Sequence, residues 1–306
     1  MNEIIHEAPP TPSSSSIFSS TDGLGYTLQN NHHAAGRLNL QHYLWHESIG
    51  YHMHPKVKIP KSNPVIADVA TGTALWPIHV AREVPSARID GIDIDMTQAP
   101  QPPWLPANVR LRSWNLFSPV PPDLRGKYDL VHVRLLVLVL SGVDPLPAIR
   151  NLLALVKPGG YLQWDELDCM HMNLRKIDES LMAPALEEIR TTLYANGRHN
   201  WALDLPRMLR YCGFEDPQIE YYGEPPELAR AFNDLTLMTM EEFAGKVAQM
   251  SRVGPARRFY EVVQRAYGES VQGVALSIPR LVVVARKPST SPDNEGWPNR
   301  RPLESL

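Results

Sequence analysis

Short apolar runs rich in β-branched residues alternate along this chain with segments whose apolar residues recur at helical spacing. The runs indicate strands at 65–69, 87–95, 109–116, 127–134, 161–166, 218–222 and 281–285. The helical pattern covers 75–84, 205–211 and 152–160, the last closed by Lys157-Pro158-Gly159-Gly160. Strands that alternate with helices imply a mainly parallel sheet with helices on both faces. The pattern therefore predicts an α/β fold with seven strands.

Further helical segments lie outside this alternation. Residues 26–51 contain apolar positions that fit one helix face, and Arg37 and Gln41 are four positions apart and would point the same way. This spacing fits a helical lid over a ligand, but it also fits a plain amphipathic surface helix. Between the last two strands, a helical insertion at 238–250 and 257–267 is placed to wall a pocket.

Composition and charge restrict the partners. The 306 residues carry a net charge of −3 without a Lys/Arg block, which predicts neither a nucleic-acid partner nor an anionic membrane surface. No apolar run reaches the length of a membrane span and no signal pattern opens the chain, so we expect a cytoplasmic protein, with the nucleus as the alternative. We expect a Pro- and Ser-rich disordered arm at 1–22, one domain at 23–287 and a loose tail at 288–306.

Cysteine and histidine are the residues to consider for metal binding. Six histidines crowd the stretch before the first strand: His32, His33, His42, His46, His52 and His54. The pair four positions apart and the His-x-His pair have spacings that metal sites use. The only cysteines, Cys169 and Cys212, lie far from them, and the H-E-x-x-H pattern is absent. We therefore expect no metal.

The turn after the first strand is where backbone could approach a ligand closely. Ala70-Thr71-Gly72-Thr73-Ala74 consists of small residues, and Pro77 suits the first turn of the following helix. Strand, small-residue turn and helix form the first unit of a nucleotide-binding domain. The turn lacks the G-x-G-x-x-G spacing of nicotinamide enzymes, and the chain lacks the G-x-x-x-x-G-K-[ST] of a triphosphate site. An alanine permits close approach at negative φ but excludes conformations that only glycine adopts cheaply.

An acidic residue ends the second predicted strand. Asp93 lies 21 positions beyond Gly72, near the offset of about 20 at which an acid meets ribose hydroxyls in Rossmann-type sites. A carboxylate there can accept hydrogen bonds from both hydroxyls. Asp95 is the alternative.

Several motifs agree in order and spacing with one protein family. They are Asp68-x-Ala70-x-Gly72, Gly91-x-Asp93, Tyr128-Asp129-x-Val131-His132 and Leu155-Val156-Lys157-Pro158-Gly159-Gly160. They resemble motifs of class I methyltransferases, which use S-adenosylmethionine on a Rossmann-like fold. Further stretches resemble a subgroup, the fungal small-molecule methyltransferases of secondary-metabolite pathways: Arg37-Leu38-x-x-Gln41-His42, Trp104-Leu105-Pro106-x-Asn108-Val109, and Val131-His132-Val133-Arg134 with Gly160-Tyr161-Leu162-Gln163-Trp164. Alanine at positions 70 and 74 and asparagine at 115 depart from the family pattern.

The resemblance implies S-adenosylmethionine as cofactor and a site at the carboxyl ends of the strands. The residues that it implies for the methionine part are Asp68, Ala70, Thr71 and Gly72. The ribose would be held by Asp93, with Ile94 beside it, and adenine would meet Asn115 and Leu116. Near the sulfonium would lie Val131 and His132, and the cofactor would be covered by Arg37 or Gln41.

The implied reaction is transfer of a methyl group to a sulfur, nitrogen or oxygen atom of a small molecule. His132 would be a general base, because its ordinary pKa lies near neutrality, or a structural hydrogen-bonding residue beside the cofactor. Asp165, Glu166 and Asp168 would orient the acceptor or be solvated loop acids. The alternative function is a cofactor-binding protein that does not methylate: a pericyclase, a dehydratase or a regulatory subunit. Oligomeric state and acceptor stay open.

Overall fold

A computed structural model describes residue 28 and residues 30–249 and 253–289. The predicted arm at 1–22 lies outside these residues, as does most of the predicted tail. Within them, no helix combines the length and the apolar composition needed to cross a membrane.

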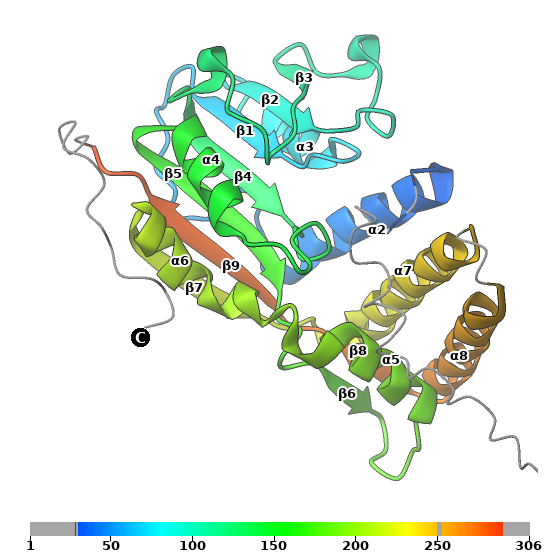
Figure 1. Ribbon diagram of the computed structural model, residues 1–306. Helices are drawn as coiled ribbons and strands as arrows, with labels where there is room; N and C mark the ends of the chain where they lie inside the picture. Colours follow the sequence, from blue (N-terminus) through cyan, green and yellow to red (C-terminus); the bar gives the residue numbers. More distant parts are fainter. Residues whose placement is uncertain (1–27, 29, 250–252, 290–306) are drawn as a thin grey trace, which may run out of the picture.

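A seven-stranded sheet forms the centre of the molecule, in the order β3-β2-β1-β4-β5-β9-β7 (Figure 1). Its strands are β1 (Val65–Val69), β2 (Arg88–Asp93), β3 (Val109–Ser113), β4 (Tyr128–Arg134), β5 (Val156–Leu167), β7 (Glu215–Tyr222) and β9 (Arg280–Arg286). β1 to β5 pair in parallel, and β9 runs antiparallel to both of its neighbours. The predicted seven-stranded, mainly parallel α/β sheet is confirmed.

Helices cover both faces of this sheet, as predicted. Successive side chains of a strand point to opposite faces. Val65 therefore joins one core with α4 (Leu146–Leu155) and α6 (Leu205–Cys212), whereas Ile66 joins another with α3 (Leu75–Glu83). Burial of both faces explains why β1 is apolar throughout except for one aspartate.

The N-terminal helix α2 (His32–Ile49) lies on the same face as α3, farther along the sheet. Trp45 packs there on Val282 and Val284 of β9. The Asn31 side chain caps the first turn, and Gly50 ends the helix with a φ of 81°. The predicted N-terminal helix is confirmed.

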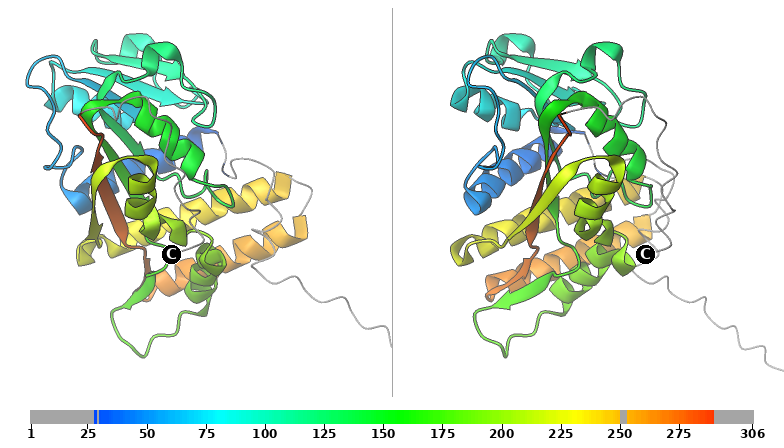
Figure 2. Two further views of the ribbon diagram at one scale, coloured as in Figure 1. Left: turned by 60° about the vertical axis from the view of Figure 1, so that its left-hand side comes forward. Right: turned by 90° about the vertical axis from the view of Figure 1, so that its left-hand side faces the viewer.

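A second helical layer lies beyond the sheet edge, where α7 and α8 run side by side (Figure 2). It comprises α5 (Pro184–Tyr194), α7 (Ala229–Gln249), α8 (Val253–Val271) and a two-stranded sheet of β6 (Asn173–Lys176) and β8 (Val274–Ser277). These elements share a core of their own, separate from the cores at the sheet. The helical insertion was predicted, but the small sheet and α5 were not.

One predicted helix ends too late. α4 stops at Leu155, and the Lys-Pro-Gly-Gly stretch already belongs to β5, which begins at Val156. The pairing with β4 slips there, from Tyr128 opposite Val156 to Leu130 opposite Tyr161. Short 3₁₀ turns complete the described chain: Pro102–Trp104, Pro122–Leu124, Ala195–Gly197, Asn200–Asp204 and Pro226–Leu228.

Candidate functional site

A cavity of about 670 Å³ opens at the carboxyl ends of the central strands and extends between α2, α5 and α7. Its volume is typical of a small-molecule site. The predicted site residues that line it are Arg37, Gln41, Asp68, Ala70, Thr71, Gly72, Asp93, Ile94, Asn115, Leu116 and His132. The fold therefore brings together residues that are spread over about a hundred positions.

Val131 is the predicted residue that does not line this cavity. Its neighbours in β4, Leu130 and His132, point to the face that α3 covers, so Val131 points to the other face. There it is fully buried in the core with α4 and α6. The Val131 side chain therefore lies on the opposite face of the sheet from His132, away from the cavity.

The turn after β1 adopts left-handed backbone at three alternate residues. Ala70 and Ala74 both have a φ of 59°, and Gly72 has a φ of 55°. A side chain in this conformation costs about 1–2 kcal/mol per residue. The two alanines therefore hold the glycine conformation rather than the negative φ that would suit them.

Asp93 ties this turn to the end of β2. Its Oδ2 accepts a hydrogen bond from the backbone N–H of Gly72 at 2.8 Å, and its Oδ1 accepts from that of Ile94 at 2.7 Å. Burial raises the pKa of Asp93, although these backbone donors oppose the shift. A carboxylate has about four lone-pair positions, so Asp93 retains capacity to accept from a ligand hydroxyl.

His132 lies between two carboxylates at the floor of the cavity. Its Nδ1 is 2.6 Å from Asp68 Oδ1, its Nε2 is 3.3 Å from Asp165 Oδ2, and its ring stacks on Trp76 with centroids 4.0 Å apart. Burial alone would lower the pKa of His132, but the two carboxylates outweigh it and the pKa is raised. Each ring nitrogen thus faces a carboxylate oxygen, an arrangement that favours the protonated ring.

The acids at the end of β5, Asp165 and Glu166 within it and Asp168 just after it, are buried, so the alternative of solvated loop acids is wrong. Asp165 is 1% exposed and accepts from Gln163, and Glu166 accepts from the backbone N–H groups of Leu136 and Leu167. Burial raises the pKa of Glu166 to about 8. Asp168 likewise holds backbone of its own loop. None of the three acids lines the cavity, so they organise its walls.

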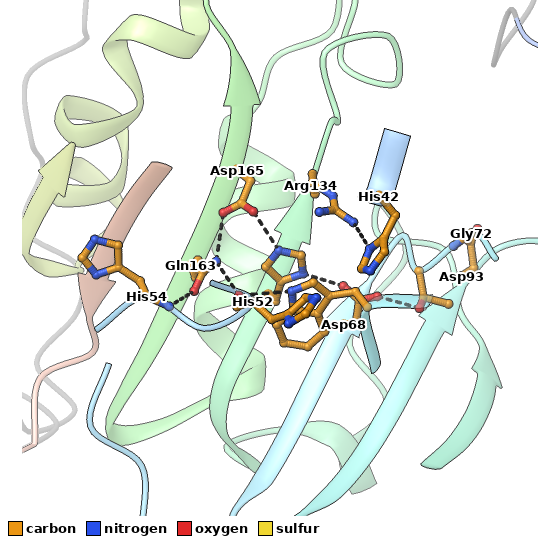
Figure 3. A network of polar contacts seen from close by, with 12 residues as sticks. His42, His52, His54, Asp68, Gly72, Asp93, Arg134, Gln163 and Asp165 are labelled. Atoms are coloured by element: carbon orange, nitrogen blue, oxygen red, sulfur yellow. Dashed lines mark hydrogen bonds and ion pairs between the residues drawn. The ribbon is translucent and has the colours of Figure 1, made fainter. Parts of the chain in front are cut away.

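Arg134 is a site residue that the sequence reasoning did not single out. It follows His132 at alternate spacing, so it shares the same face of the sheet and lines the cavity. Its one side-chain hydrogen bond within the described chain runs from Nη2 to His42 Nδ1, at 2.9 Å (Figure 3). Arg37, in contrast, is held by Glu242 of α7 at 2.6 Å. Arg134 therefore retains donors that a ligand carboxylate could use.

Three histidines meet beside Arg134. His42, His52 and His79 each offer a ring nitrogen within 4.8 Å of the other two. However, His42 Nε2 and His79 Nδ1 are 2.7 Å apart, a hydrogen-bond distance. Two nitrogen ligands of one tetrahedral zinc ion keep about 3.3 Å between them, from Zn–N bonds of about 2.0–2.1 Å. Metal binding would thus require the pair to separate, and the expectation of no metal stays a prediction.

No family model matches the chain. Among curated relatives, Methyltransferase grgD of Penicillium sp is 41% identical over 152 residues, which are 47% of this chain and 52% of that protein. N-methyltransferase tcpN of Claviceps purpurea is 34% identical over 133 residues, 42% of this chain and 47% of that protein. Secondary metabolism regulator LAE1 of Hypocrea atroviridis is 30% identical over 109 residues, 35% of this chain and 30% of that protein. The chain spans about half the length of the curated relatives it matches.

Solved structures are similar at lower identity. Phosphoethanolamine N-methyltransferase 2 of Haemonchus contortus has a TM-score of 0.42 at 11% identity, over 90% of this chain and 57% of that chain. The [4+2]-cyclase SpnF has a TM-score of 0.42 at 17% identity, over 93% of this chain and 100% of that chain. The sequence relatives confirm what the motifs predicted: this chain is similar to fungal methyltransferases.

Proposed function

We propose that the protein transfers the methyl group of S-adenosylmethionine to a sulfur, nitrogen or oxygen atom of a small molecule in fungal secondary metabolism. The observation that carries this proposal is the single cavity lined by the turn after β1, Asp93 and the Asn115 stretch. These strand-end groups come together in the order that the methyltransferase motifs imply. The similarity to proteins named methyltransferase supports the same reading.

The residues present suit this cofactor. Asp93 Oδ2 has one lone pair left for a ribose hydroxyl, since Oδ1 accepts from the backbone N–H groups of Ile94 and Asp95. The cavity-lining Arg134 has donors left for the carboxylate of the methionine part. Asn115 Oδ1 accepts from the backbone of Phe117 at 3.0 Å, which leaves its amide N–H groups and a second lone pair for adenine. When bound, the cofactor would supply a methyl carbon already activated by a positively charged sulfur.

The chain's contribution to the reaction is then alignment. Both ring nitrogens of His132 face a carboxylate, Asp68 or Asp165, so the ring has no free lone pair with which to accept a proton from a substrate. This favours the structural role of His132 over the role of general base. Its imidazolium holds the two carboxylates that flank it, and Asp68 in turn accepts from Thr71 in the turn after β1. Positioning alone can supply much of the barrier reduction for an in-line displacement. A thiol acceptor needs little further help, because part of it is already thiolate near neutral pH, whereas a hydroxyl acceptor needs more.

Calorimetry with S-adenosylhomocysteine tests cofactor binding directly, and absence of binding would contradict the proposal. Methyl transfer is tested by incubating the protein with S-adenosylmethionine and a metabolite extract. We expect S-adenosylhomocysteine to accumulate together with a product that is one methyl group heavier. A changed metabolite without cofactor consumption would instead support the non-methylating alternative, which remains in view because one relative is named a regulator.

A further inference from the structure

The cavity has a second end, away from the turn after β1. Helices α5 and α7, strand β8 and the segment after β4 line it with apolar side chains: Val137, Leu193, Leu235, Met240, Phe243 and Leu276. A surface of this kind favours an apolar ligand, because burial removes apolar area from water. We call this part the acceptor end.

Most polar groups of the acceptor end already have partners. The hydroxyl groups of Thr236 and Thr239 donate to carbonyl oxygens of their own helix, at 3.1 and 2.9 Å. Arg280 forms a buried ion pair with Glu224. Burial raises the pKa of the Cys169 thiol, which keeps it protonated. Apart from the Nε of Arg280, which is buried without a hydrogen-bond partner among the residues that the structure describes, these groups have little left for recognising a ligand.

Among the described residues, His199 is the neutral titratable side chain of the acceptor end with an unpaired nitrogen. Its side chain lines the cavity and is 4% exposed, and its Nδ1 is buried without a hydrogen-bond partner in the described part of the chain. Burial lowers the pKa of His199 to about 4, so the ring is neutral near pH 7 and has one donor and one acceptor nitrogen. Buried polar groups are normally paired, and an unpaired one destabilises the fold.

The backbone leading to His199 is also unusual. Ala195, Asn196 and Gly197 have φ values of 47°, 55° and 78°, so three successive residues are left-handed. Ala195 carries a side chain that disfavours this conformation, whereas asparagine and glycine adopt it more readily. Such strain persists where the surrounding structure holds it, and it concentrates at ligand-binding segments.

We propose that His199 is a substrate-binding residue, and that the acceptor is a mainly apolar molecule whose hydroxyl or N–H group hydrogen-bonds to this ring. The inference rests on the proposed function, because it assigns the other end of the same cavity to the cofactor. The apolar walls bind the body of the acceptor, and the imidazole selects for one polar group on it. A site that pairs with a hydroxyl group rejects the analogue that lacks it, since its own polar group is then left unpaired.

Matched probes test this without knowledge of the natural acceptor. The pairs are 2-naphthol with 2-methylnaphthalene, and 4-phenylphenol with 4-methylbiphenyl, each titrated by calorimetry in the presence of S-adenosylhomocysteine. We expect wild type to bind the hydroxyl member of a pair about tenfold more tightly. His199→Leu should abolish this preference and keep binding of the methyl member. His33→Leu, at an exposed position of α2 outside the cavity, is the matched control and should behave as wild type.

The melting temperature gives a second readout. His199→Leu removes an unpaired buried polar group, so the free protein should melt at a higher temperature than wild type although it has lost ligand selectivity. The inference is overturned if the hydroxyl preference survives in His199→Leu, or if wild type binds no member of either pair. Binding of S-adenosylhomocysteine is measured separately, so its failure would contradict the proposed function while leaving the naphthol result interpretable.

Discussion

The two ends of the cavity differ in how their residues can be recognised in the sequence. The cofactor end consists of strand ends and the turns that follow them, as at Gly72, Asp93 and Asn115. The acceptor end draws on α5, α7 and β8, with apolar side chains that resemble those of any helix core. A short motif therefore defines the first end, whereas only tertiary packing defines the second.

The cofactor end and the acceptor end also differ in charge. Asp68 and Asp93 give the cofactor end two carboxylates, and Arg134 gives it a cation. The acceptor end has the neutral His199 and the internally paired Arg280. The first end suits a zwitterionic ligand with ribose hydroxyls, and the second suits a mainly apolar molecule.

The largest effect is expected at His132, which supports the floor of the cofactor end. His132→Gln removes the charge between Asp68 and Asp165 and leaves these buried carboxylates without their cation. We expect the free energy of unfolding to fall by about 3–5 kcal/mol, measured by urea denaturation. The exposed His33→Gln should change it by less than about 0.5 kcal/mol. Equal stabilities of the two variants would contradict the buried ion-pair network.

The same network predicts the direction of a pH effect. The pKa of His132 is raised in the folded protein, so its contribution to stability is complete below the unfolded pKa of about 6.5. That contribution is lost as pH rises through the folded pKa. The stability difference between wild type and His132→Gln should therefore shrink on raising the pH, as urea titrations at several pH values would measure. A difference that grows with pH would show that the ring is neutral in the folded state.

A smaller effect is expected for Asp93, and it separates the two ends. Asp93→Ala should weaken S-adenosylhomocysteine binding by about 1–3 kcal/mol, because ribose hydroxyls lose their acceptor. Binding of 2-naphthol at the acceptor end should change little. Asp95→Ala tests the alternative ribose ligand, whose carboxylate already accepts from Asn30. Unchanged affinity in Asp93→Ala, with a loss in Asp95→Ala, would reverse the assignment.

The difference between the cofactor end and the acceptor end explains which site residues could be predicted from the sequence. The offset from Gly72 predicted Asp93, and the resemblance to methyltransferase motifs implied Asp68 and His132; alternation along β4 then sets which of its side chains face the cavity. Arg134 could have been found by extending that alternation two residues beyond His132. His199 could not, because its significance lies in a missing hydrogen bond that only packing reveals. The small sheet of β6 and β8 joins strands about a hundred residues apart, which no local pattern encodes.

The smallest predicted effect concerns the turn at the cofactor end. Ala70 and Ala74 have a φ of 59°, which glycine adopts without a steric penalty. The gain from relieving this strain exceeds the extra entropy that glycine brings to the unfolded chain, so Ala70→Gly and Ala74→Gly should each stabilise the protein by about 1 kcal/mol. Ala154→Gly, in the right-handed backbone of α4, is the matched control and should destabilise it by about 1 kcal/mol. Thermal and urea unfolding measure both. If all three variants are destabilised alike, the turn is not held in the left-handed conformation, and the two alanines occupy it without strain.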